Sequence, residues 1–438
     1  MDPKLNESEK ILNIGLDDFD APNYGCTTYV AVRLIEFLEK IGEIKFLDYP
    51  LLIRLNPNIP SKTRGNGAIA LKIYYDDPNY IIDEISNFAS KIVNLKHPKT
   101  SPVIVFKVGK PGRLYKLYQR ALKEYVPRKI VYRIAEREKV KIVGWRGKKG
   151  LVGALAAIGA VLKDYTFELL AYRKPGTQRK IDYHTLKKLD LQYSEETYGN
   201  VDYTKHRVLI TPRGDDPVYF GIRGDNPEIL LKIFHKLRTE NIERWAIFKT
   251  NQGTGVHFSP KKVAEVRPYD SVCIRGLIVD KHVGKGGDIF FKLKDSTGIL
   301  ECAIYKETGF LNSVGHLLDR EMIVEACGGI RPGSSSHSMT LNVETLHIIR
   351  IYPKITLRNP VCPCCGARMK SLGFNKGFKC KKCGFKSTNV KKSIELTYSI
   401  LEPGVYLPSP RAYRHLTLPK RRFGKRPYYN KLISPWHG

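Results

Sequence analysis

Four regularly spaced cysteines near the C-terminus constrain the fold of this chain more than any other feature of its sequence. They form two Cys-x-x-Cys knuckles separated by fourteen residues, and they are Cys362, Cys365, Cys380 and Cys383. Each knuckle presents two thiolates to a tetrahedral ion, so the spacing predicts a Zn²⁺-binding ribbon over residues 358–390. Cys364 lies inside the first knuckle and is interpreted as a spare thiol. A redox pair is the alternative, but it does not explain both knuckles.

The charge of the chain indicates its class of partner. Among 438 residues, 74 are Lys or Arg and 43 are Asp or Glu, which gives a formal net charge of +31. Each Lys or Arg that neutralises a phosphate releases a condensed counterion, so nucleic acid is the first partner expected. A hydrophobic content of 42% is typical of packed globular proteins and excludes a wholly disordered chain.

The distribution of apolar residues and cysteines indicates the compartment. The longest uninterrupted apolar run, Leu151–Leu162, is shorter than the roughly 20 residues that a membrane span needs, so no membrane partner is expected. Five of the nine cysteines crowd into residues 362–383, which argues against a secreted disulfide framework and for a metal site in a reducing compartment. We therefore expect a cytoplasmic protein, and no obligate protein partner is implied.

Apolar periodicity divides the chain into segments of different character and predicts a multidomain α/β plus β protein. An apolar run at 11–16, followed by helical spacing at 27–41, begins an alternation of strands and helices that predicts one α/β domain over residues 10–203. Residues 204–262 continue as a smaller α/β unit. Five short β-rich runs and one helix-like stretch then predict an OB-type barrel over 266–352, with an SH3-like barrel as the alternative.

Three carboxylates gather where the first predicted strand ends. Asp17, Asp18 and Asp20 precede the predicted helix that begins near Thr27. Carboxylates hold a hard Mg²⁺ that keeps its waters and bridges phosphate oxygens, and the free N–H groups of a helix N-terminus favour phosphate. The loop therefore predicts a magnesium–phosphate site with all three carboxylates facing one spot. The alternative is an acidic loop that caps the helix through Thr27 or Thr28.

Two glycine-containing loops are candidates to meet these aspartates at a phosphate. The first is the Arg-Gly-Asn-Gly stretch at 64–67, and the second, at 144–150, carries two lysines immediately before an apolar helix. A Gly-rich, Lys-bearing loop at a helix N-terminus is suited to cradling phosphates. No Gly-x-x-x-x-Gly-Lys-Ser/Thr pattern exists, which excludes an ordinary P-loop, and a plain turn is the alternative for each loop. The candidate phosphate-binding residues are Arg64, Asn66, Lys148, Lys149 and Gly150.

Carboxylates between residues 202 and 225 are candidates for binding a cation or a guanidinium group through paired oxygens. They are Asp202, Asp215, Asp216 and Asp225. Solvated turns are the simpler alternative for them. The later segment Thr250–His257 is polar and flexible enough to touch a ligand, but a linker is the simpler explanation, because Gly and Thr dominate such loops.

The last segment, residues 391–438, interleaves cations with aromatic rings and is expected to be partly unstructured. Cations track a phosphate backbone while aromatic faces stack on unpaired bases, a combination suited to folded RNA with splayed loops. An ordinary basic surface is the alternative. The candidate tRNA-binding residues of this tail are Arg411, Arg414, Arg421, Arg422, Lys425, Arg426 and Tyr428.

Four motifs, taken in their order along the chain, closely resemble those of one family, the archaeal tRNA-isoleucine 2-agmatinylcytidine synthetases, or agmatidine synthetases. The motifs are Leu16–Thr28, Arg54–Gly67, Gly150–Gly159 and Thr250–Gly253. The resemblance spans nearly the whole chain. It implies a kinase-like domain over 10–203, a ferredoxin-like domain over 204–262, an OB fold over 266–352, a zinc ribbon over 358–390 and a basic tail over 391–438.

The resemblance also implies an activity. It implies the ATP-dependent replacement of the 2-oxo group of the wobble cytidine, in tRNA-isoleucine with a CAU anticodon, by agmatine, so that the anticodon pairs with AUA. A ring carbonyl oxygen is a poor leaving group, so its phosphorylation converts it into phosphate before the amine of agmatine attacks carbon 2. The implied cofactors are ATP, Mg²⁺ and Zn²⁺, and the implied partners are this tRNA and agmatine.

The family motifs imply roles for individual residues. The family resembles an unusual kinase that autophosphorylates a threonine in a Gly-Cys-Thr-Thr motif, which places the phosphoacceptor at Thr27. Asp17, Asp18 and Asp20 are expected to hold magnesium and phosphate. The chain carries Phe19 where many relatives have a small polar residue, which leaves the three carboxylates in place. The guanidinium of agmatine needs carboxylate partners, and the four aspartates between 202 and 225 are candidates by charge alone.

Two other classes of protein share some of these features. A non-catalytic RNA-binding protein explains the OB-type barrel and the ribbon, but it leaves the aspartate loop and about 250 residues of α/β structure without a role. A metal-dependent nuclease shares the aspartate loop, but it has no need of the glycine-containing loops. A requirement for a phosphate donor distinguishes the ATP-using enzyme from both.

Overall fold

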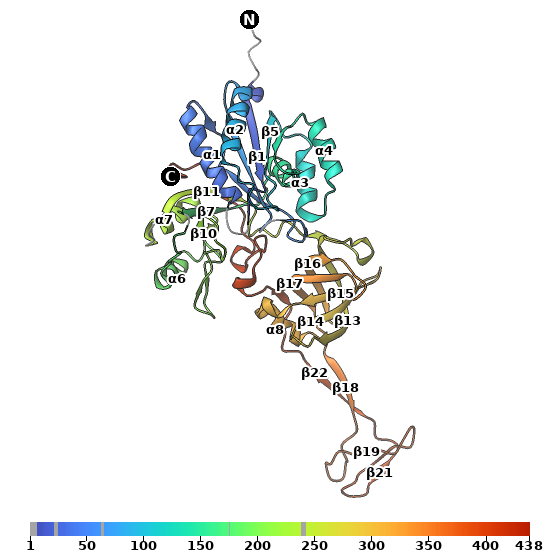
Figure 1. Cartoon of the computed structure of the whole chain (residues 1–438). Helices are drawn as coiled ribbons and strands as arrows, with labels where there is room; N and C mark the ends of the chain where they lie inside the picture. Colours follow the sequence, from blue (N-terminus) through green and yellow to red (C-terminus); the bar gives the residue numbers. More distant parts are fainter. Residues whose placement is uncertain (1–6, 22–24, 63–64, 175, 238–241) are drawn as a thin grey trace.

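The computed structural model describes residues 7–438 apart from 22–24, 63–64, 175 and 238–241. Four parts follow one another down Figure 1: a body built on one large sheet, a barrel, a two-stranded stalk and a small terminal ribbon. Within the described residues, no helix combines the length and the apolar composition that crossing a bilayer requires.

A nine-stranded sheet forms the body. Its strand order is β10-β7-β11-β3-β4-β1-β5-β6, with β2 beside β4. The strands are β1 (Ile11–Asp17), β2 (Lys45–Phe46), β3 (Leu51–Arg54), β4 (Gly67–Tyr74), β5 (Val103–Val108), β6 (Lys141–Gly144), β7 (Thr166–Arg173), β10 (Val218–Gly224) and β11 (Ile242–Thr250). Neighbours run antiparallel except β3 and β11, which are parallel and join the two halves of the sheet.

Helices cover both faces of the first half of this sheet (Figure 1). They are α1 (Thr27–Ile41), α2 (Pro78–Ile92), α3 (Leu114–Lys123), α4 (Arg128–Arg137) and α5 (Leu151–Ile158). Alternate residues of β1, such as Ile14, share a core with α1 and α2, while Val105 of β5 faces the core formed with α3 and α5. Gly15 lets α5 lie directly on β1, because a Cβ there would come within 2.3 Å of the Ala154 carbonyl oxygen.

The second half of the sheet carries its own helices, α6 (Tyr183–Gln192) and α7 (Pro227–Lys236), and a small pair of strands, β8 (Val201–Asp202) and β9 (Arg207–Val208). α7 packs on β7 and β10. The domain boundary expected between residues 203 and 204 would divide one sheet. Strand β7 lies before the boundary in sequence, and it pairs with β10 and β11, which lie after it.

The expected OB-type barrel is confirmed. Its strands are β13 (Ser271–Val283), β14 (Ile289–Lys294), β15 (Ile299–Ile304), β16 (Ile323–Arg331) and β17 (Thr340–Arg350), with α8 (Phe310–Leu317) between the third and fourth and the short β12 (Ser259–Pro260) before the first. Pairing of β13 with β16 and of β15 with β17 closes the barrel. Cys273 and Cys327 lie opposite each other on β13 and β16 and form a disulfide, a pairing that the cysteine count did not suggest.

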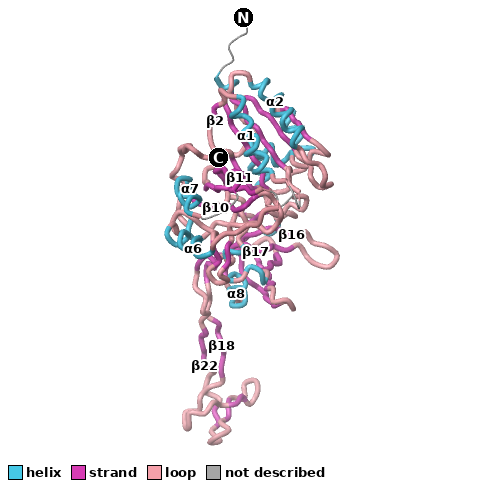
Figure 2. The backbone as a smooth tube through the Cα atoms, turned by 60° about the vertical axis from the view of Figure 1, so that its left-hand side comes forward, coloured by secondary structure: helices cyan, strands magenta, loops and turns pink. Residues whose placement is uncertain are grey.

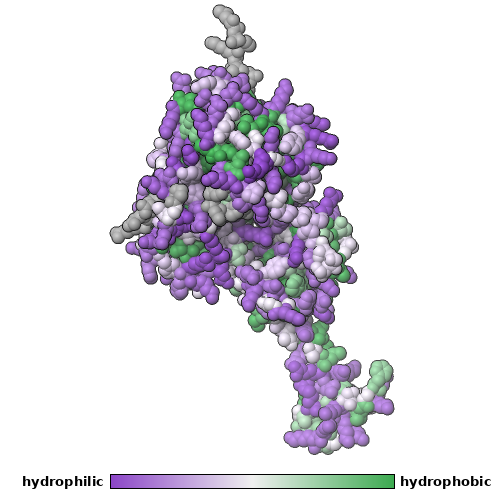
Figure 3. All heavy atoms as spheres, in the orientation of Figure 1, coloured by the Kyte–Doolittle hydropathy of each residue, from purple (hydrophilic) through white to green (hydrophobic). Residues whose placement is uncertain are grey.

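A stalk and a ribbon extend away from the barrel (Figure 2). The stalk pairs β18 (Lys354–Arg358) with β22 (Ser393–Thr397), and the ribbon contains β19 (Lys370–Ser371), β20 (Phe378–Lys379) and β21 (Lys386–Ser387). Hydrophilic residues cover most of the face seen in Figure 3. The stalk differs, because its apolar side chains are exposed, including Ile355 at 66%, Leu357 at 60% and Ile394 at 67%.

The C-terminal tail returns from the stalk to the body, which corrects the expectation of a partly unstructured segment. β23 (Gly404–Tyr406) pairs with β17 of the barrel, and the chain then crosses to the large sheet (Figure 1). There Trp436 is buried against Phe46 and Tyr49, and the Trp245 N–H donates a hydrogen bond to the carbonyl oxygen of Gly438. Aromatic burial and backbone pairing together order the tail.

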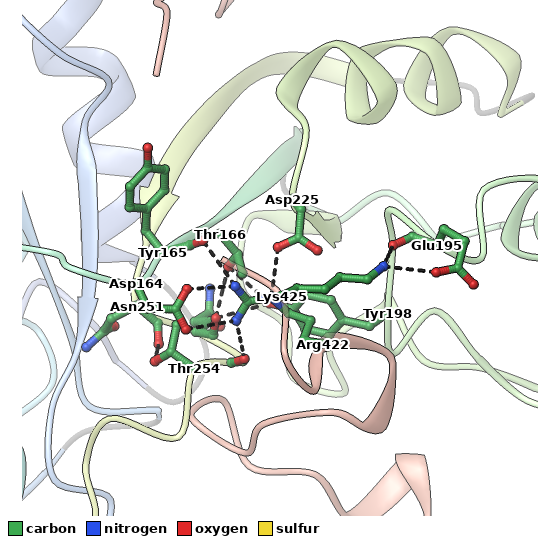
Figure 4. A network of polar contacts seen from close by, with 12 residues as sticks. Asp164, Tyr165, Thr166, Glu195, Tyr198, Asp225, Asn251, Thr254, Arg422 and Lys425 are labelled. Atoms are coloured by element: carbon green, nitrogen blue, oxygen red, sulfur yellow. Dashed lines mark hydrogen bonds and ion pairs between the residues drawn. The ribbon is translucent and has the colours of Figure 1, made fainter. Parts of the chain in front are cut away.

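A buried guanidinium also holds the tail against the body (Figure 4). Arg422 is 2% exposed. Its Nε donates to Asp225 at 2.8 Å, its Nη2 to Asp164 at 2.8 Å, and its Nη1 to the carbonyl oxygen of Gly253 at 2.6 Å. A buried charge needs such partners, because removing one member of a buried pair leaves the other charge uncompensated.

We expect Arg422→Met to destabilise the protein by about 3–5 kcal/mol, because Asp225 then remains buried without its cation. Burial already raises the pKa of Asp225 against the opposing charge of Arg422. A carboxyl group whose pKa is raised by folding disfavours the folded state as the pH rises, so the loss of stability in the variant is largest near about pH 8 and shrinks toward about pH 5.

Thermal unfolding across that pH range measures this effect, and limited proteolysis locates it. Arg426→Met is the matched control, because Arg426 is exposed on the same tail. Equal unfolding temperatures for the Arg422 variant, the Arg426 variant and the unaltered protein would contradict the anchoring role of Arg422.

Candidate functional site

Two cavities flank the loop that follows β1. The first, of about 320 Å³, is lined by Asp17 and Asp18. The second, of about 340 Å³, is lined by Asp20 and Thr27. The structure therefore corrects the expectation that all three carboxylates face one spot. Asp18 adopts a left-handed backbone conformation, with φ of 62°, which turns the chain between the two cavities.

The first cavity brings together the aspartate loop and both glycine-containing loops, as the sequence predicted. Besides Asp17 and Asp18, its walls include Asn66, Lys149 and Gly150. The side chain of Lys148 is not among the residues that line it, and Arg64 lies outside the described residues. The cavity also sits at the N-terminus of α5, where free N–H groups favour an anion.

Glycines at the start of α5 make room for Asp17. A Cβ at Gly153 would lie 1.9 Å from the Asp17 Oδ2 atom, so only glycine permits this approach. Burial, with the nearby charges of Asp18 and Asp20, raises the pKa of Asp17 well above its usual range. A bound cation would offset this repulsion, and one or two carboxylates with phosphate oxygens suffice to hold Mg²⁺. Asp17 and Asp18 therefore fit a magnesium site.

Thr27 begins α1 and points its hydroxyl group at the second cavity. The hydroxyl donates a hydrogen bond to Asp20 Oδ2 at 2.7 Å and accepts one from the Phe19 N–H at 3.2 Å. The residue before it, Cys26, lines the same cavity. Burial and the charge of Asp20 raise the pKa of Cys26 to about 11, so this thiol stays protonated and is a poor nucleophile at neutral pH.

Glu168, on the opposite side of the second cavity, is a functional candidate that the sequence analysis missed. It is 1% exposed, and its carboxylate accepts hydrogen bonds from Arg223 Nε at 2.9 Å and from the Gln252 amide, with Arg54 Nη2 at 3.9 Å. Gly221 leaves room for it, since a Cβ there would meet Glu168 Oε1 at 2.7 Å. The available signal was a single acidic residue within the apolar strand β7, which is buried along its whole length.

The four candidate agmatine-binding aspartates separate in the structure. Asp216 lines the second cavity and also accepts a hydrogen bond from Arg179 at 3.1 Å. Asp202 pairs with Arg411 of the tail, Asp225 pairs with Arg422, and Asp215 lies exposed on a loop. Only Asp216, among these four, faces a cavity that also contains residues of the aspartate loop.

The Thr250–His257 segment is buried, which corrects its interpretation as a linker. Asn251, Gln252 and His257 are each 0% exposed. The Asn251 side chain accepts a hydrogen bond from the Arg54 N–H and donates one to the Arg54 carbonyl oxygen, both at 2.8 Å. These bonds tie the end of β11 to the end of β3, so the segment packs against the strand that carries Arg54.

Most of the candidate tRNA-binding cations of the tail are bound within the protein. The ion pairs are Arg411 with Asp202, Arg414 with Glu344, Arg421 with Asp190, Arg422 with Asp164 and Asp225, and Lys425 with Glu195. Buried Arg422 is inaccessible to an RNA ligand, which corrects its expected role. Arg426 and Tyr428 remain exposed, with Tyr428 at 62%.

The ribbon brings its four predicted ligands together. The sulfur atoms of the two knuckles lie within 4.8 Å of one another, and they belong to Cys362, Cys365, Cys380 and Cys383. Cys364 is exposed and outside this cluster, as its position in the knuckle predicted. Hydrogen bonds from the Cys383 and Lys382 N–H groups, together with the Cys365 thiol, lower the pKa of Cys380, which favours the thiolate that Zn²⁺ binds.

Family models match four successive parts of the chain. They are described as the TiaS TCKD domain (residues 13–76), the TiaS FLD domain (148–257), an OB-fold nucleic acid binding domain (272–349) and the TiaS C-terminal zinc ribbon domain (359–397). The second of these begins before β7, in keeping with the pairing of β7 with β10 and β11.

Two relatives, each named as the tRNA-isoleucine 2-agmatinylcytidine synthetase TiaS, match over nearly their whole lengths. The protein of Thermofilum pendens is 41% identical, over 95% of this chain and 96% of its own. That of Pyrococcus horikoshii is 39% identical, over 93% of this chain and 96% of its own.

Solved structures agree with these relatives. The crystal structure of TiaS in complex with its isoleucine tRNA and ATP has a TM-score of 0.85 at 33% identity, covering 96% of this chain and 99% of that chain. A complex of TiaS with the same tRNA, AMPCPP and agmatine has a TM-score of 0.82 at 31% identity, with the same coverage. Both sequence and structure thus confirm the resemblance of the four motifs, and the chain belongs to the TiaS family of tRNA-isoleucine 2-agmatinylcytidine synthetases.

Proposed function

We propose that this protein is an ATP-dependent enzyme that replaces the 2-oxo group of the wobble cytidine, in tRNA-isoleucine with a CAU anticodon, by agmatine. One observation above all supports this proposal. The loop from Asp17 to Thr27 contributes to two cavities at once, so a phosphate-activating site and an amine-binding site adjoin across a few residues. The names of the full-length relatives support the same reaction.

The first cavity is the proposed ATP site. Asp17 and Asp18 would hold Mg²⁺, which when bound neutralises phosphate charge during phosphoryl transfer. Lys149 and Asn66 supply a cation and an amide toward the phosphates, and the N–H groups at the start of α5 add to them. Arg64 and Lys148 remain predictions for this site, because neither is among the described residues that line it.

The second cavity is the proposed site of amine attack. Asp216 is a carboxylate suited to the guanidinium of agmatine, whereas Arg54 and Arg223 are suited to a phosphorylated base. Phosphorylation of the cytosine 2-oxygen turns a poor leaving group into phosphate. The amine nitrogen then bonds to carbon 2 as the carbon–oxygen bond breaks, and phosphate departs with the electron pair.

Thr27 is the proposed phosphoacceptor of the protein itself. Its hydroxyl group already donates to Asp20 Oδ2, so Asp20 could take the hydroxyl proton as the threonine oxygen bonds to a phosphorus of ATP, while the bond from that phosphorus to the rest of the nucleotide breaks and the nucleotide oxygen leaves with the electron pair. The N-terminus of α1, at which Thr27 lies, would favour the phosphate charge afterwards.

The barrel, the ribbon and the exposed tail residues are the proposed tRNA-binding parts. The barrel matches an OB-fold nucleic acid binding model, and residues 358–386 carry eight basic residues and no acidic ones. Exposed Arg426 and Tyr428 offer a cation and a stacking face for RNA. We propose that Zn²⁺ bound by the four cysteines holds the ribbon in this binding conformation.

Mass spectrometry of nucleosides tests the reaction. A tRNA-isoleucine transcript with a CAU anticodon is incubated with the protein, Mg²⁺, ATP and agmatine, and each component is omitted in turn. We expect the wobble cytidine to gain agmatine only in the complete mixture. Unmodified RNA that still binds tightly would instead favour a non-catalytic RNA-binding protein.

Thr27→Ala is expected to abolish the modified nucleoside while leaving tRNA affinity within about twofold, because the change removes the hydroxyl without altering a basic surface. Thr27→Ser is the matched control, since it keeps the hydroxyl group and should keep most of the activity. Product formation and filter-binding affinity are measured together. Full activity in the alanine variant would remove Thr27 from the mechanism.

Asp17→Asn and Asp18→Asn are each expected to lower ATP-dependent product formation at least ~100-fold, because each change removes the negative charge of a proposed Mg²⁺ ligand. The apparent Mg²⁺ requirement should rise in any variant that keeps measurable activity. Asp83→Asn, on the exposed side of α2, is the control. An unchanged Mg²⁺ titration in both variants would argue against these two ligands.

Cys380→Ser is expected to lower the zinc content measured by inductively coupled plasma mass spectrometry and to weaken tRNA binding, because a tetrahedral site loses one ligand. Cys364→Ser is the matched control from the same ribbon, since Cys364 lies outside the sulfur cluster. Equal zinc content in the two variants would show that Cys380 is not a zinc ligand.

A further inference from the structure

His415, on the returning tail, lies where three cavities meet. It lines the second cavity described above and two smaller ones, of about 280 Å³ and about 190 Å³. The smaller cavities are lined by tail residues, including Tyr413 and Arg414. His415 is common to the linings of all three cavities, so its imidazole lies between the second cavity and the tail.

Hydrogen bonds orient the imidazole ring. The Gln252 amide nitrogen donates to Glu168, so the Gln252 oxygen faces His415 Nδ1, at 2.8 Å. An amide oxygen only accepts, and Nδ1 therefore carries the hydrogen. Nε2 is left with a lone pair, and it points toward Gly65, where a Cβ would lie only 2.7 Å away. Gly65 and His415 both line the second cavity, so Nε2 lies beside Gly65 at the wall of that cavity.

The surroundings keep this imidazole neutral before substrate arrives. Burial, followed by the positive charges of Arg54 and Arg223, lowers the pKa of His415 well below its usual value. The charged groups around it are Arg54 on β3, Arg223 on β10, Arg414 on the tail and, through Gln252, Glu168 on β7. A dianionic phosphoryl group between the two arginines would neutralise them and raise the proton affinity of the imidazole again.

We propose that His415 is the base that removes a proton from the amine of agmatine as it attacks carbon 2, with Gln252 and Glu168 as positioning residues. This inference rests on the proposed function. An amine nitrogen that bonds to carbon gains positive charge and must release a proton for a stable product. The neutral Nε2 atom accepts that proton, while the carbon–oxygen bond breaks and phosphate leaves with its electron pair.

A chain of hydrogen bonds runs from His415 through Gln252 to Glu168, and this relay stabilises the protonated imidazole. Once Nε2 is protonated, the positive charge is shared with Nδ1, whose hydrogen is bonded to Gln252 Oε1. The Gln252 amide passes this polarisation to the Glu168 carboxylate. The carboxylate is held in place by Arg223, so the relay is fixed before the substrate binds.

His415→Asn tests the proposal, because an asparagine amide can keep the donor toward Gln252 while removing the base at Nε2. We expect kcat for the agmatine-modified nucleoside to fall at least ~100-fold, with KM for agmatine and tRNA affinity within about threefold. The phosphorylated RNA intermediate should form from ATP at the normal rate and accumulate. His316→Asn on α8, an exposed histidine, is the control.

Gln252→Met tests the relay through the pH–rate profile, which would stay unchanged if Gln252 had a purely structural role. Loss of the acceptor at Nδ1 destabilises the imidazolium, so the acid limb of the pH–rate profile should shift to lower pH. His415→Gln serves as a second variant if the asparagine variant unfolds at the assay temperature, and thermal unfolding of each variant checks this.

The outcomes separate this inference from the proposed function. If the unaltered protein makes no agmatine-modified nucleoside, the proposed function fails. If it does, and His415→Asn retains kcat within about threefold, only the role of His415 is overturned. Loss of the phosphorylated intermediate in the His415 variants would likewise overturn it, because the residue would then act in the phosphoryl step.

Discussion

A guanidinium buried between two carboxylates holds the last part of this chain to the half of the large sheet that contains β7, β10 and β11. Arg422 joins Asp164, which precedes β7, to Asp225, which follows β10, and it also binds the carbonyl oxygen of Gly253. Three segments distant in sequence therefore meet at one planar cation. Its geometry suits this task, because five N–H donors in a rigid fork can satisfy several acceptors at once. Together with the burial of Trp436 and the pairing of β23 with β17, this contact fixes the position of the tail, which brings His415 into the lining of the second cavity.

The loop that follows a single strand, β1, lines both cavities of the body. β1 lies between β4 and β5 in the sheet, and the loop after it turns at Asp18 so that Asp17 and Asp18 line the first cavity and Asp20 lines the second. Helix α5 approaches β1 closely because glycines replace side chains at their contact. The two cavities thus share one short segment of backbone, so the sites proposed for phosphate and for the amine adjoin.

Local patterns predicted the parts of this structure that depend on neighbouring residues. The strand at 11–16, the helix beginning at Thr27, the five strands of the barrel and the cysteine knuckles all follow from periodicity or short spacing. The meeting of Asp17 with Asn66 and Lys149 was also predicted, because each lies beside a strand end or a helix start. Such positions gather at one edge of a sheet.

Contacts between distant segments could not be predicted in this way. The partners of Asp202 and Asp225 come from about 200 residues later in the chain, so their charges alone left them as candidates for a ligand site or for solvated turns. The disulfide depends on the pairing of β13 with β16, and the buried role of Gln252 depends on the returning tail. Glu168 was a different case. The sequence showed it as the one acidic residue of an apolar strand, but it matched no catalytic motif.

The return of the tail has a consequence for the order in which the protein becomes complete. The cavity that contains Asp20 and Thr27 is also lined by His415, which follows the barrel, the stalk and the ribbon in the sequence. A chain still emerging from the ribosome can fold its first strands and helices before His415 is added, but this cavity then lacks one of its lining residues. The second cavity is therefore completed only after the barrel, the stalk and the ribbon have been synthesised.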